Sequence, residues 1–349
     1  MPSTDHHGVL LVNLGTPDSA GVAAVRRYLG EFLMDGRVID LPGPLRWLLV
    51  HGAILPFRPA RSAHAYRKIW TAGGSPLLVH GRALAEGVRR ELGEGFEVAL
   101  AMRYGRPSMR EVLAGLASRG VTELTVVPLY PQGAASSSGS SIARVYELAA
   151  GYWEPPRLRV VPPFFDDAGF LDAFASVARR SLEQARPDHV LFSFHGVPER
   201  HVRRSDPTGR CLADGRCSDA LGPQNRGCYR AQAFATARAL AGRLGLDADR
   251  YSTTFQSRLG RAKWIEPHTD RRISELARAG VKRLAVVCPS FVADCLETLE
   301  EIGIRGREQF RSEGGEELTL VPSLNAEPEW VKAVARMARE GEVRHEPVE

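Results

Sequence analysis

Short runs of Val, Leu and Phe, each bounded by turn residues, alternate along the chain with longer segments in which apolar residues recur at helical spacing. The runs expected to form strands are residues 8–13, 96–103, 123–130, 158–163, 189–195, 251–257 and 283–290. The segments expected to form amphipathic helices include residues 81–92, 108–119, 169–185, 231–243 and 270–279. Because the strand runs are apolar throughout, the pattern predicts parallel sheets that are covered by helices on both faces.

The two halves of this pattern resemble each other. Each opens with a strand that ends in polar residues and a proline, at residues 9–17 and 190–198. Each continues with a long insertion, a second strand that ends in a polar group, and a third strand that leads into a proline-containing loop. We therefore predict two similar doubly wound, Rossmann-like α/β domains at residues 8–150 and 151–326, followed by a C-terminal helix and tail at 327–349. One large sheet is the alternative.

Composition and charge exclude several classes of protein. Of the 349 residues, 44% are hydrophobic and 25% are charged, which is typical of a soluble globular protein. The net charge of +5 is spread along the chain without an arginine-rich arm, so no nucleic acid is expected as a partner. The polar start at residues 1–7 leaves no room for a signal peptide, and no stretch approaches the roughly 20 apolar residues of a membrane span. We expect a cytoplasmic protein, with at most a peripheral contact at the inner membrane.

Ligands of open parallel sheets bind beyond the carboxyl ends of the strands, so polar residues that directly follow predicted strands are candidate functional residues. His195 ends the apolar run 190–194. A neutral imidazole at that position can accept a proton or ligate a metal ion. A packed, hydrogen-bonded histidine is the alternative.

Three carboxylates, those of Asp294, Glu297 and Glu301, follow the last predicted strand of the second half. Their spacing of three and four residues places them on one face of a helix, with Asp294 as its N-cap. Carboxylates on one face repel each other unless a cation lies between them, so the row suits a hard divalent ion or the transfer of protons. The alternative is a solvated face that the helix dipole favours.

Two segments of the first half are candidate binding elements. The small hydroxyl residues at 136–141 precede a predicted helix, where they can bind a carboxylate or phosphate, or form a flexible polar loop. The segment 41–70 is apolar, aromatic and basic. It can form a lip that grips a flat apolar ligand and touches a membrane surface, or an ordinary core helix.

Three of the five cysteines lie in one Gly- and Asp-rich loop at residues 206–230, namely Cys211, Cys217 and Cys228. An odd number of cysteines in a chain of cytoplasmic character does not favour a disulfide framework. A bound Fe–S cluster or zinc ion would fold such a polar loop around itself. Because four ligands are needed, Cys295 or Cys288 would have to complete the set. Free surface thiols are the alternative.

Taken together, these residues make the chain resemble the ferrochelatases, the enzymes that insert ferrous iron into a porphyrin to make haem. The resemblance runs from about residue 8 to about residue 325 and rests on many motifs in the same order. The motifs are residues 13–17, 66–69, 74–77, 102–105, 130–132 with 138–141, 192–198, 255–258 with Trp264, and 294–299.

The resemblance implies a chelatase fold with two four-stranded parallel sheets and a porphyrin in the cleft between the domains. It implies that His195 and Glu297 are catalytic and meet the substrate iron, with Asp294 and Glu301 as a relay. Which of His195 and Glu297 binds the metal and which takes protons stays open. The resemblance further implies porphyrin-binding side chains, of which Arg67, Lys68 and Ser140 would meet the propionates: Leu14, Arg67, Lys68, Arg103, Tyr104, Ser140 and Trp264.

The cysteines depart from the family pattern. Relatives with a 2Fe–2S cluster take one ligand from the loop after Tyr-Pro-Gln and three from a C-terminal extension. Here Ala135 stands at the first position, and no cysteine follows Asn325. The loop 206–230 is also longer than in relatives without a cluster. We therefore expect a 2Fe–2S cluster with an internal ligand set of Cys211, Cys217, Cys228 and Cys295, with Cys288 as the other candidate for the fourth ligand.

The expected reaction is the insertion of Fe2+ into protoporphyrin IX, the last step of haem biosynthesis, because an apolar lip suits a ring with few carboxylates. The expected partners are therefore the porphyrin and ferrous iron, and the sequence indicates no oligomeric state. Coproporphyrin III is the alternative substrate. A chelatase that loads cobalt or nickel into a sirohydrochlorin-type ring would favour paired histidines, and a carrier of haem or porphyrin would need no acidic row.

Overall fold

The computed structural model describes residues 6–213, 216–258, 260 and 262–345, which divide into two compact units. Unit 1 comprises residues 6–130, 134–163 and 326–343. Unit 2 comprises residues 131–133, the described part of 164–325, and residues 344–345. The chain therefore passes between the units more than once, which two consecutive domains would not require.

The described part of unit 1 contains a four-stranded parallel sheet in the order β2-β1-β3-β4. Its strands are β1 (His6–Thr16), β2 (Phe96–Gly105), β3 (Val121–Pro128) and β4 (Arg157–Val160). Residues 9–12 of the central strand β1 are fully buried, which explains their continuous apolar run. Because β4 pairs with β3, it belongs to this sheet, and a boundary at residue 150 would separate it from its partner.

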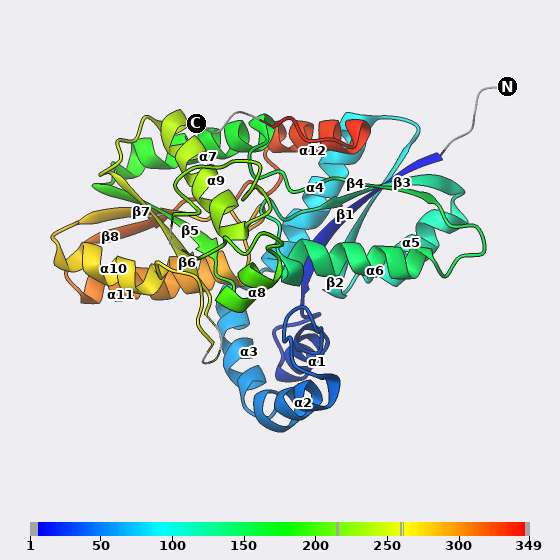
Figure 1. Ribbon diagram of the computed structural model, residues 1–349, viewed down its shortest axis with the longest axis horizontal. Helices are drawn as coiled ribbons and strands as arrows, with labels where there is room; N and C mark the ends of the chain where they lie inside the picture. Colours follow the sequence, from blue (N-terminus) through cyan, green and yellow to red (C-terminus); the bar gives the residue numbers. More distant parts are fainter. Residues whose placement is uncertain (1–5, 214–215, 259, 261, 346–349) are drawn as a thin grey trace. The chain divides into compact units, whose positions relative to one another are not determined.

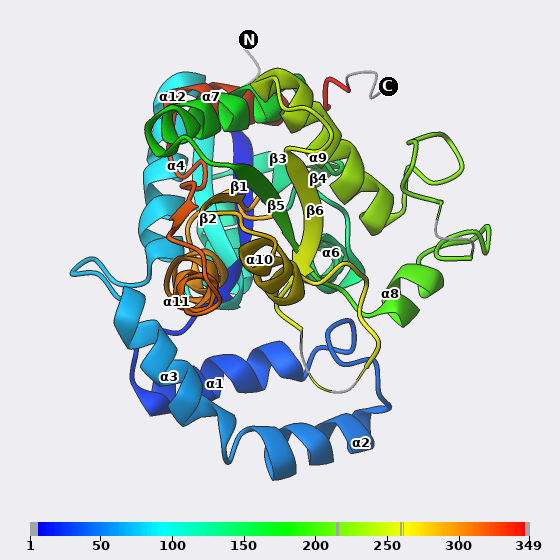
Figure 2. The same ribbon diagram turned by 90° about the vertical axis from the view of Figure 1, so that its left-hand side faces the viewer.

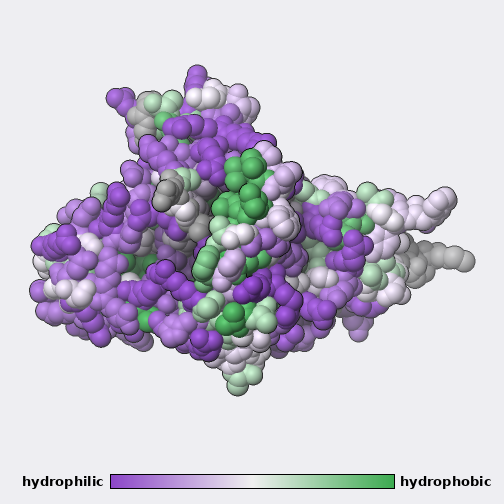
Figure 3. Space-filling model, turned by 90° about the horizontal axis from the view of Figure 1, so that it is seen from below, coloured by the Kyte–Doolittle hydropathy of each residue, from purple (hydrophilic) through white to green (hydrophobic). Residues whose placement is uncertain are grey.

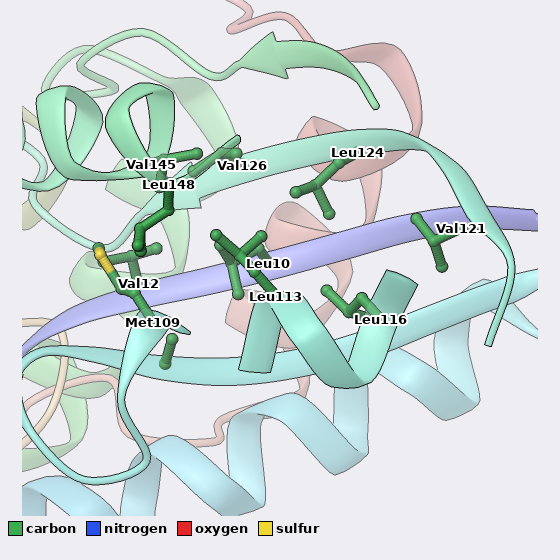
Figure 4. Close-up of a cluster of buried hydrophobic side chains, with 11 residues drawn as sticks. Leu10, Val12, Met109, Leu113, Leu116, Val121, Leu124, Val126, Val145 and Leu148 are labelled. Atoms are coloured by element: carbon green, nitrogen blue, oxygen red, sulfur yellow. The ribbon is translucent and has the colours of Figure 1, made fainter. Parts of the chain in front are cut away.

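Helices cover both faces of this sheet (Figure 1). On one face, α4 (Pro76–Leu92) packs against β2 and β1, and α12 (Pro328–Glu340) packs against α4 and β3. The C-terminal helix therefore completes unit 1. On the other face lie α5 (Met109–Ser118) and α6 (Ser140–Ala149). The core on that face, shown in Figure 4, contains Leu10, Val12, Ala101, Met109, Leu113, Leu116, Val121, Leu124, Val126, Val145 and Leu148.

The lip, residues 41–70, follows α1 (Val22–Leu33) and belongs to unit 1. It contains α2 (Gly43–Trp47), the π-helical segment η1 (Leu48–Ile54) and α3 (Arg58–Ile69). Figures 1 and 2 show α1, α2 and α3 gathered beyond the carboxyl end of β1. The lip leaves large apolar side chains exposed, so it is not an ordinary core helix: Leu41, Leu45, Trp47, Leu48, Leu49 and Phe57. Among the described helices, none is both long enough and apolar enough to cross a bilayer.

The described part of unit 2 repeats the arrangement, with four parallel strands in the order β6-β5-β7-β8. They are β5 (His189–His195), β6 (Tyr251–Gln256), β7 (Arg283–Val287) and β8 (Glu317–Leu320). The sequence pattern did not predict β8, which is a short edge strand with two apolar residues. The predicted fold class, α/β with two doubly wound parallel sheets, is confirmed.

Helices also cover the sheet of unit 2, with α7 (Ala168–Ala185) and α9 (Tyr229–Leu244) packed together beside β7 and β6. A second group packs on β5, β7 and β8 and consists of α10 (Thr269–Arg278), the π-helical η3 (Glu297–Gly306) and α11 (Arg307–Ser312). Phe310, Leu191 and Leu284 are central to that core. The short helix α8 (Glu199–Arg204) follows β5 and precedes the cysteine-bearing loop.

Candidate functional site

His195 ends β5, and its ring is fixed by its own backbone. The ring Nδ1 lies 2.6 Å from the carbonyl oxygen of Gly196. A carbonyl can only accept, so Nδ1 is the donor, which leaves Nε2 as the ring atom that can accept a proton or meet a metal ion. The backbone of His195 is held as well, because Tyr229 donates its hydroxyl to the carbonyl oxygen at 2.6 Å and the amide donates to Ser290 Oγ at 3.3 Å. The half-buried ring is thereby oriented for proton transfer or metal contact.

Glu297 and Glu301 lie on η3, four residues apart, and Glu301 is anchored to the end of β6. Ser257 donates its amide to Glu301 Oε1 at 2.9 Å and its hydroxyl to Oε2 at 2.6 Å. Burial raises the pKa of the Glu301 carboxyl, the bonds from Ser257 oppose the rise, and the charge of Glu297 adds to it. Ser257 has a φ of 68°, a left-handed conformation that costs a non-glycine residue about 1–3 kcal/mol. Strain and a π-helix at the same position are typical of functional sites.

Asp294 differs from the other two carboxylates. It precedes η3, whose first residue is Glu297, so Asp294 is not the N-cap that the sequence predicted. Its Oδ1 accepts from Thr298 Oγ1 at 3.1 Å, and its Oδ2 accepts from Asn325 Nδ2 at 2.8 Å. The side chain is buried and ties the start of η3 to the segment after β8. A relay role for Asp294 stays a prediction.

Gln256 is one of the polar strand-end residues that the sequence places at the site, although the sequence alone assigns it no role of its own. It is the last residue of β6 and is 3% exposed. Its Nε2 donates to the carbonyl oxygen of Glu297 at 2.9 Å, and its Oε1 accepts from Ser193 Oγ at 2.6 Å. Ser193 in turn lies 2.8 Å from Thr269 Oγ1. The amide therefore links the start of η3 to β5 and α10. The sequence feature that points to Gln256 is its position at the end of a predicted strand.

Cys288 and Cys295 are buried in the same region. Burial raises the pKa of both thiols well above the usual range, and the charge of Glu297 adds to the effect on Cys295. The Cys288 thiol lies 3.6 Å from Gln256 Oε1, to which it donates, and the amide of Cys295 donates to Thr298 Oγ1 at 3.0 Å. Both thiols are therefore packed around the acidic turn.

The loop cysteines lie elsewhere in unit 2. Cys211 and Cys228 are buried with their side chains in hydrogen-bonding contact, and burial followed by this contact raises the pKa of Cys211. Asn225 Nδ2 donates to the carbonyl oxygen of Cys217 at 2.6 Å. The described residues, which omit 214–215 of this loop, contain no group of three His, Cys, Asp or Glu side chains that could hold a metal ion. The four-cysteine set is thus not assembled among the described residues, and the membership of Cys295 in it stays a prediction.

Three of the predicted porphyrin-binding residues meet in unit 1, at the carboxyl end of β2 and the start of α6. Arg103 Nε donates to Ser140 Oγ at 2.7 Å, and its guanidinium lies over the Tyr104 ring at 4.4 Å. Their common partner is Asp35, which the sequence analysis missed because it follows a helix rather than a strand. Asp35 Oδ2 accepts from Arg103 Nη2 at 2.6 Å, from Ser140 Oγ at 2.5 Å and from Tyr104 OH at 2.9 Å.

The other predicted binding residues are spread over both units. In unit 1, Leu14 is half-buried near the end of β1, and Arg67 and Lys68 are exposed in the last turn of α3. In unit 2, Trp264 pairs with Pro198, so it lies against the segment that follows His195. The backbone at Gly15, with φ +119°, approaches Tyr104 so closely that a Cβ atom would lie 1.8 Å from its carbonyl oxygen. The roles of these residues in porphyrin binding stay predictions.

Solved structures with the same architecture identify the fold. SirB from Bacillus subtilis with Fe3+ matches with a TM-score of 0.53 and 14% identity, over 96% of this chain and 95% of that chain. The sirohydrochlorin chelatase SirB from Bacillus subtilis subspecies spizizenii in complex with cobalt matches with a TM-score of 0.53 and 12% identity, over 96% and 94%. At such identities the likeness shows the fold alone, which is the chelatase fold.

Sequence comparison identifies the family. The sequence model of the ferrochelatase family matches residues 6–342. Ferrochelatase of Coxiella burnetii (strain Dugway 5J108-111) is 49% identical over 95% of this chain and 93% of its own length. Ferrochelatase of Ectopseudomonas mendocina (strain ymp) is 52% identical over 94% and 96%. This chain belongs to the ferrochelatase family, whose members are metal-inserting lyases, and the resemblance drawn from the motifs is confirmed.

Proposed function

We propose that this protein inserts ferrous iron into protoporphyrin IX to form protohaem, with His195 and Glu297 at the reaction centre. The observation that carries the proposal is an imidazole whose Nδ1 is occupied by Gly196 O, in the same unit as an acidic turn on a π-helix. Membership of the ferrochelatase family supports the same activity.

The reaction is an exchange of protons for a metal ion. Two pyrrole N–H bonds break, two protons leave, and the iron replaces its water ligands with ring nitrogens without a change of oxidation state. The protein must therefore accept protons on one side of the exchange and give the hydrated ion a temporary oxygen ligand on the other. A positioned base typically contributes about 10²–10⁴-fold to such a proton transfer.

The residues divide these tasks by their chemistry. Neutral His195 accepts a pyrrole proton at Nε2, because Nδ1 already carries one. Glu301 holds a proton more readily than an ordinary glutamate, because burial and the charge of Glu297 raise its pKa. Glu297 meets the iron as an oxygen ligand, and Glu301 carries protons away. The amide of Gln256 fixes the backbone of Glu297 during this exchange.

An insertion assay tests the proposal. Wild-type protein is supplied with Fe2+ under anaerobic conditions and with either protoporphyrin IX or coproporphyrin III, and loss of free-porphyrin fluorescence is followed. We expect turnover with protoporphyrin IX, and Glu297→Gln should reduce it by about 10²-fold or more. Glu308→Gln, an exposed change on α11, is the matched control and should be neutral. Porphyrin binding without turnover in the wild type would identify a carrier, and a preference for coproporphyrin III would change the substrate.

The lip supports the choice of an apolar ring and a peripheral membrane contact. No Asp or Glu occurs from residue 41 to residue 85, where Arg and Lys number six. Figure 3, which looks at the end of the molecule that carries α2, shows hydrophobic side chains gathered among hydrophilic ones. Exposed Leu45, Trp47 and Leu48 beside basic groups suit the headgroup region of an anionic bilayer.

Vesicle co-sedimentation tests the membrane contact. Phosphatidylglycerol vesicles should sediment the protein more strongly than phosphatidylcholine vesicles, and the double variant Trp47→Ala, Leu48→Ala should weaken the effect. Trp153→Ala is the matched control, because Trp153 is fully exposed in unit 1 outside the lip. Equal sedimentation of the wild type, the double variant and Trp153→Ala would show that the lip does not make the membrane contact.

For the cluster, we propose a smaller group of cysteine ligands than the four residues expected from the sequence. Cys211, Cys217 and Cys228 are proposed to contribute to a 2Fe–2S centre within their own loop, supported by the contact between the Cys211 and Cys228 thiols. Anaerobically purified protein is analysed for visible absorption, iron and acid-labile sulfide. Cys228→Ser should abolish the signal, whereas Cys288→Ser should leave it unchanged. A colourless wild-type protein without sulfide would contradict the proposal.

A further inference from the structure

Asp35 is a buried charge of unit 1 with several hydrogen-bond partners, and the proposed reaction does not use it. Its side chain is 7% exposed. Three donors meet on Oδ2, from Arg103, Ser140 and Tyr104, at 2.5–2.9 Å. Oδ1 accepts from the amide of Arg37 at 2.7 Å. Burial opposes ionisation, but the bonds from Ser140, Arg37 and Tyr104 and the charge of Arg103 outweigh it and lower the pKa of Asp35.

The carboxylate joins elements that are distant in the sequence. Asp35 lies between α1 and the lip, whereas Arg103 and Tyr104 end β2 and Ser140 begins α6. Two further contacts fasten α1 to the same strand: Glu31 Oε2 accepts from the amide of Gly105 at 2.9 Å, and the rings of Phe32 and Tyr104 meet edge to face at 5.2 Å. Asp35 therefore supplies the charged part of the attachment between the lip and the sheet.

The side chain of Arg103 is correspondingly held by contacts within the protein. Its Nη2 binds Asp35, its Nε binds Ser140, and its side chain is 16% exposed over the Tyr104 ring. An arginine paired with a carboxylate in a fixed geometry brings little net charge to a ligand. Arg103 thus acts chiefly as a structural partner of Asp35, and exposed Arg67 is better suited to attract a propionate.

We propose that Asp35 is a positioning residue that fixes the lip against the carboxyl end of β2 and the start of α6, and so sets the affinity for the porphyrin. The inference rests on the proposed function and deepens it, because it assigns the porphyrin-binding geometry of unit 1 to a residue outside the predicted site. The chemistry at His195 and Glu297 does not depend on Asp35.

The test compares Asp35→Asn with Asp35→Glu and a control. Asp35→Asn removes the charge but preserves the shape, so KM for the porphyrin should rise about tenfold or more while KM for Fe2+ stays within about twofold. Asp35→Glu preserves the charge and should restore most of the porphyrin affinity. Asp18→Asn is the matched control, because the ion pair of Asp18 with Arg27 is exposed and 3.7 Å long, and it should match the wild type.

Hydrogen exchange provides a readout that does not need turnover. In Asp35→Asn, amides of residues 34–57 should exchange faster while those of β1, β3 and α5 keep their wild-type protection. Unchanged exchange in the lip together with an unchanged KM for porphyrin would overturn the proposal. A uniform loss of protection across unit 1 would overturn it too, because Asp35 would then serve global stability alone. If the wild type inserts no iron, the proposed function fails, while exchange and porphyrin binding by fluorescence quenching still decide the role of Asp35.

Discussion

At the carboxyl end of β2 in unit 1, the buried carboxylate of Asp35 meets the guanidinium of Arg103 at 2.6 Å. At the carboxyl end of β6 in unit 2, the enclosed carboxylate of Glu301 is bonded to the neutral groups of Ser257. Burial raises its pKa, and the charge of Glu297 affects this pKa more than the opposing charge of Arg305 does. The two sheets have the same strand order, yet the pKa of one acid is lowered and that of the other is raised. Charge that is compensated holds a structure in place, whereas charge that is left uncompensated is available to protons and metal ions.

The largest expected effect falls on His195. His195→Ala removes the Nε2 acceptor, so turnover should fall by about 10²–10⁴-fold while the affinity for porphyrin changes little. The measurement is initial-rate kinetics of iron insertion together with porphyrin fluorescence quenching. His189→Ala is the matched control, because His189 lies at the other end of β5, bonded to Ser252 Oγ at 2.8 Å. Comparable losses in both variants would show that the strand as a whole, and not the imidazole at its end, limits the reaction.

The next largest effect is expected when Asp35 in unit 1 loses the positive charge of Arg103. Arg103→Ala leaves Asp35 buried without its cation, which should lower the free energy of unfolding by about 3–5 kcal/mol. Denaturant unfolding followed by circular dichroism measures this change. Arg144→Ala breaks the exposed pair with Glu147 on α6 and should cost at most about 0.5 kcal/mol. If the two variants were equally stable, the Asp35 cluster would not be the structural anchor that its burial implies.

The contrast between the units also explains which site residues the sequence could predict. The positions of His195 and Glu297 could be predicted because the strands before them are apolar and the carboxyl edge of a parallel sheet collects ligands, whereas their roles stay predictions. Asp35 follows a helix, and only the folding of α1 against β2 brings it to that edge. Gln256 stands at a strand end, but its role depends on where η3 begins. Whether Cys295 joins the loop cysteines is likewise not encoded in residue spacing, because the direction of a thiol is set by tertiary packing.

The fold could be predicted from the sequence for a related reason. Apolar runs predicted seven strands that cover both sheets because buried parallel strands need no polar face. The short β8 carries only two apolar residues and pairs at an edge, so its sequence is indistinct from a loop. The domain boundary depended on the partner of β4, and strand pairing is a non-local property.

The smallest expected effect, and the most direct test of the contrast, is the dependence of stability on pH. The folded-state pKa of Glu301 is raised, so its contribution to stability is fully present below the unfolded pKa and is lost as the pH rises through the folded pKa. The folded-state pKa of Asp35 is lowered, so its contribution is present above the unfolded pKa and is lost as the pH falls through the folded pKa. The two acids should therefore respond to pH in opposite directions.

Urea unfolding of Glu301→Gln and Asp35→Asn at pH values from about 2 to about 8 measures this difference, since the effect of Asp35 lies below about pH 4 and that of Glu301 above it. Relative to the wild type, Glu301→Gln should gain stability as the pH rises, because it lacks the cost of a buried charge beside Glu297. Asp35→Asn should lose stability relative to the wild type as the pH rises to about 4, because the wild type acquires there the carboxylate that Arg103 compensates, and the difference should stay constant at higher pH. Glu308→Gln should give a flat difference, since that side chain is exposed. Parallel pH profiles for the first two variants would mean that the two carboxylates have similar surroundings, and the division between a structural acid in unit 1 and a reactive acid in unit 2 would have to be abandoned.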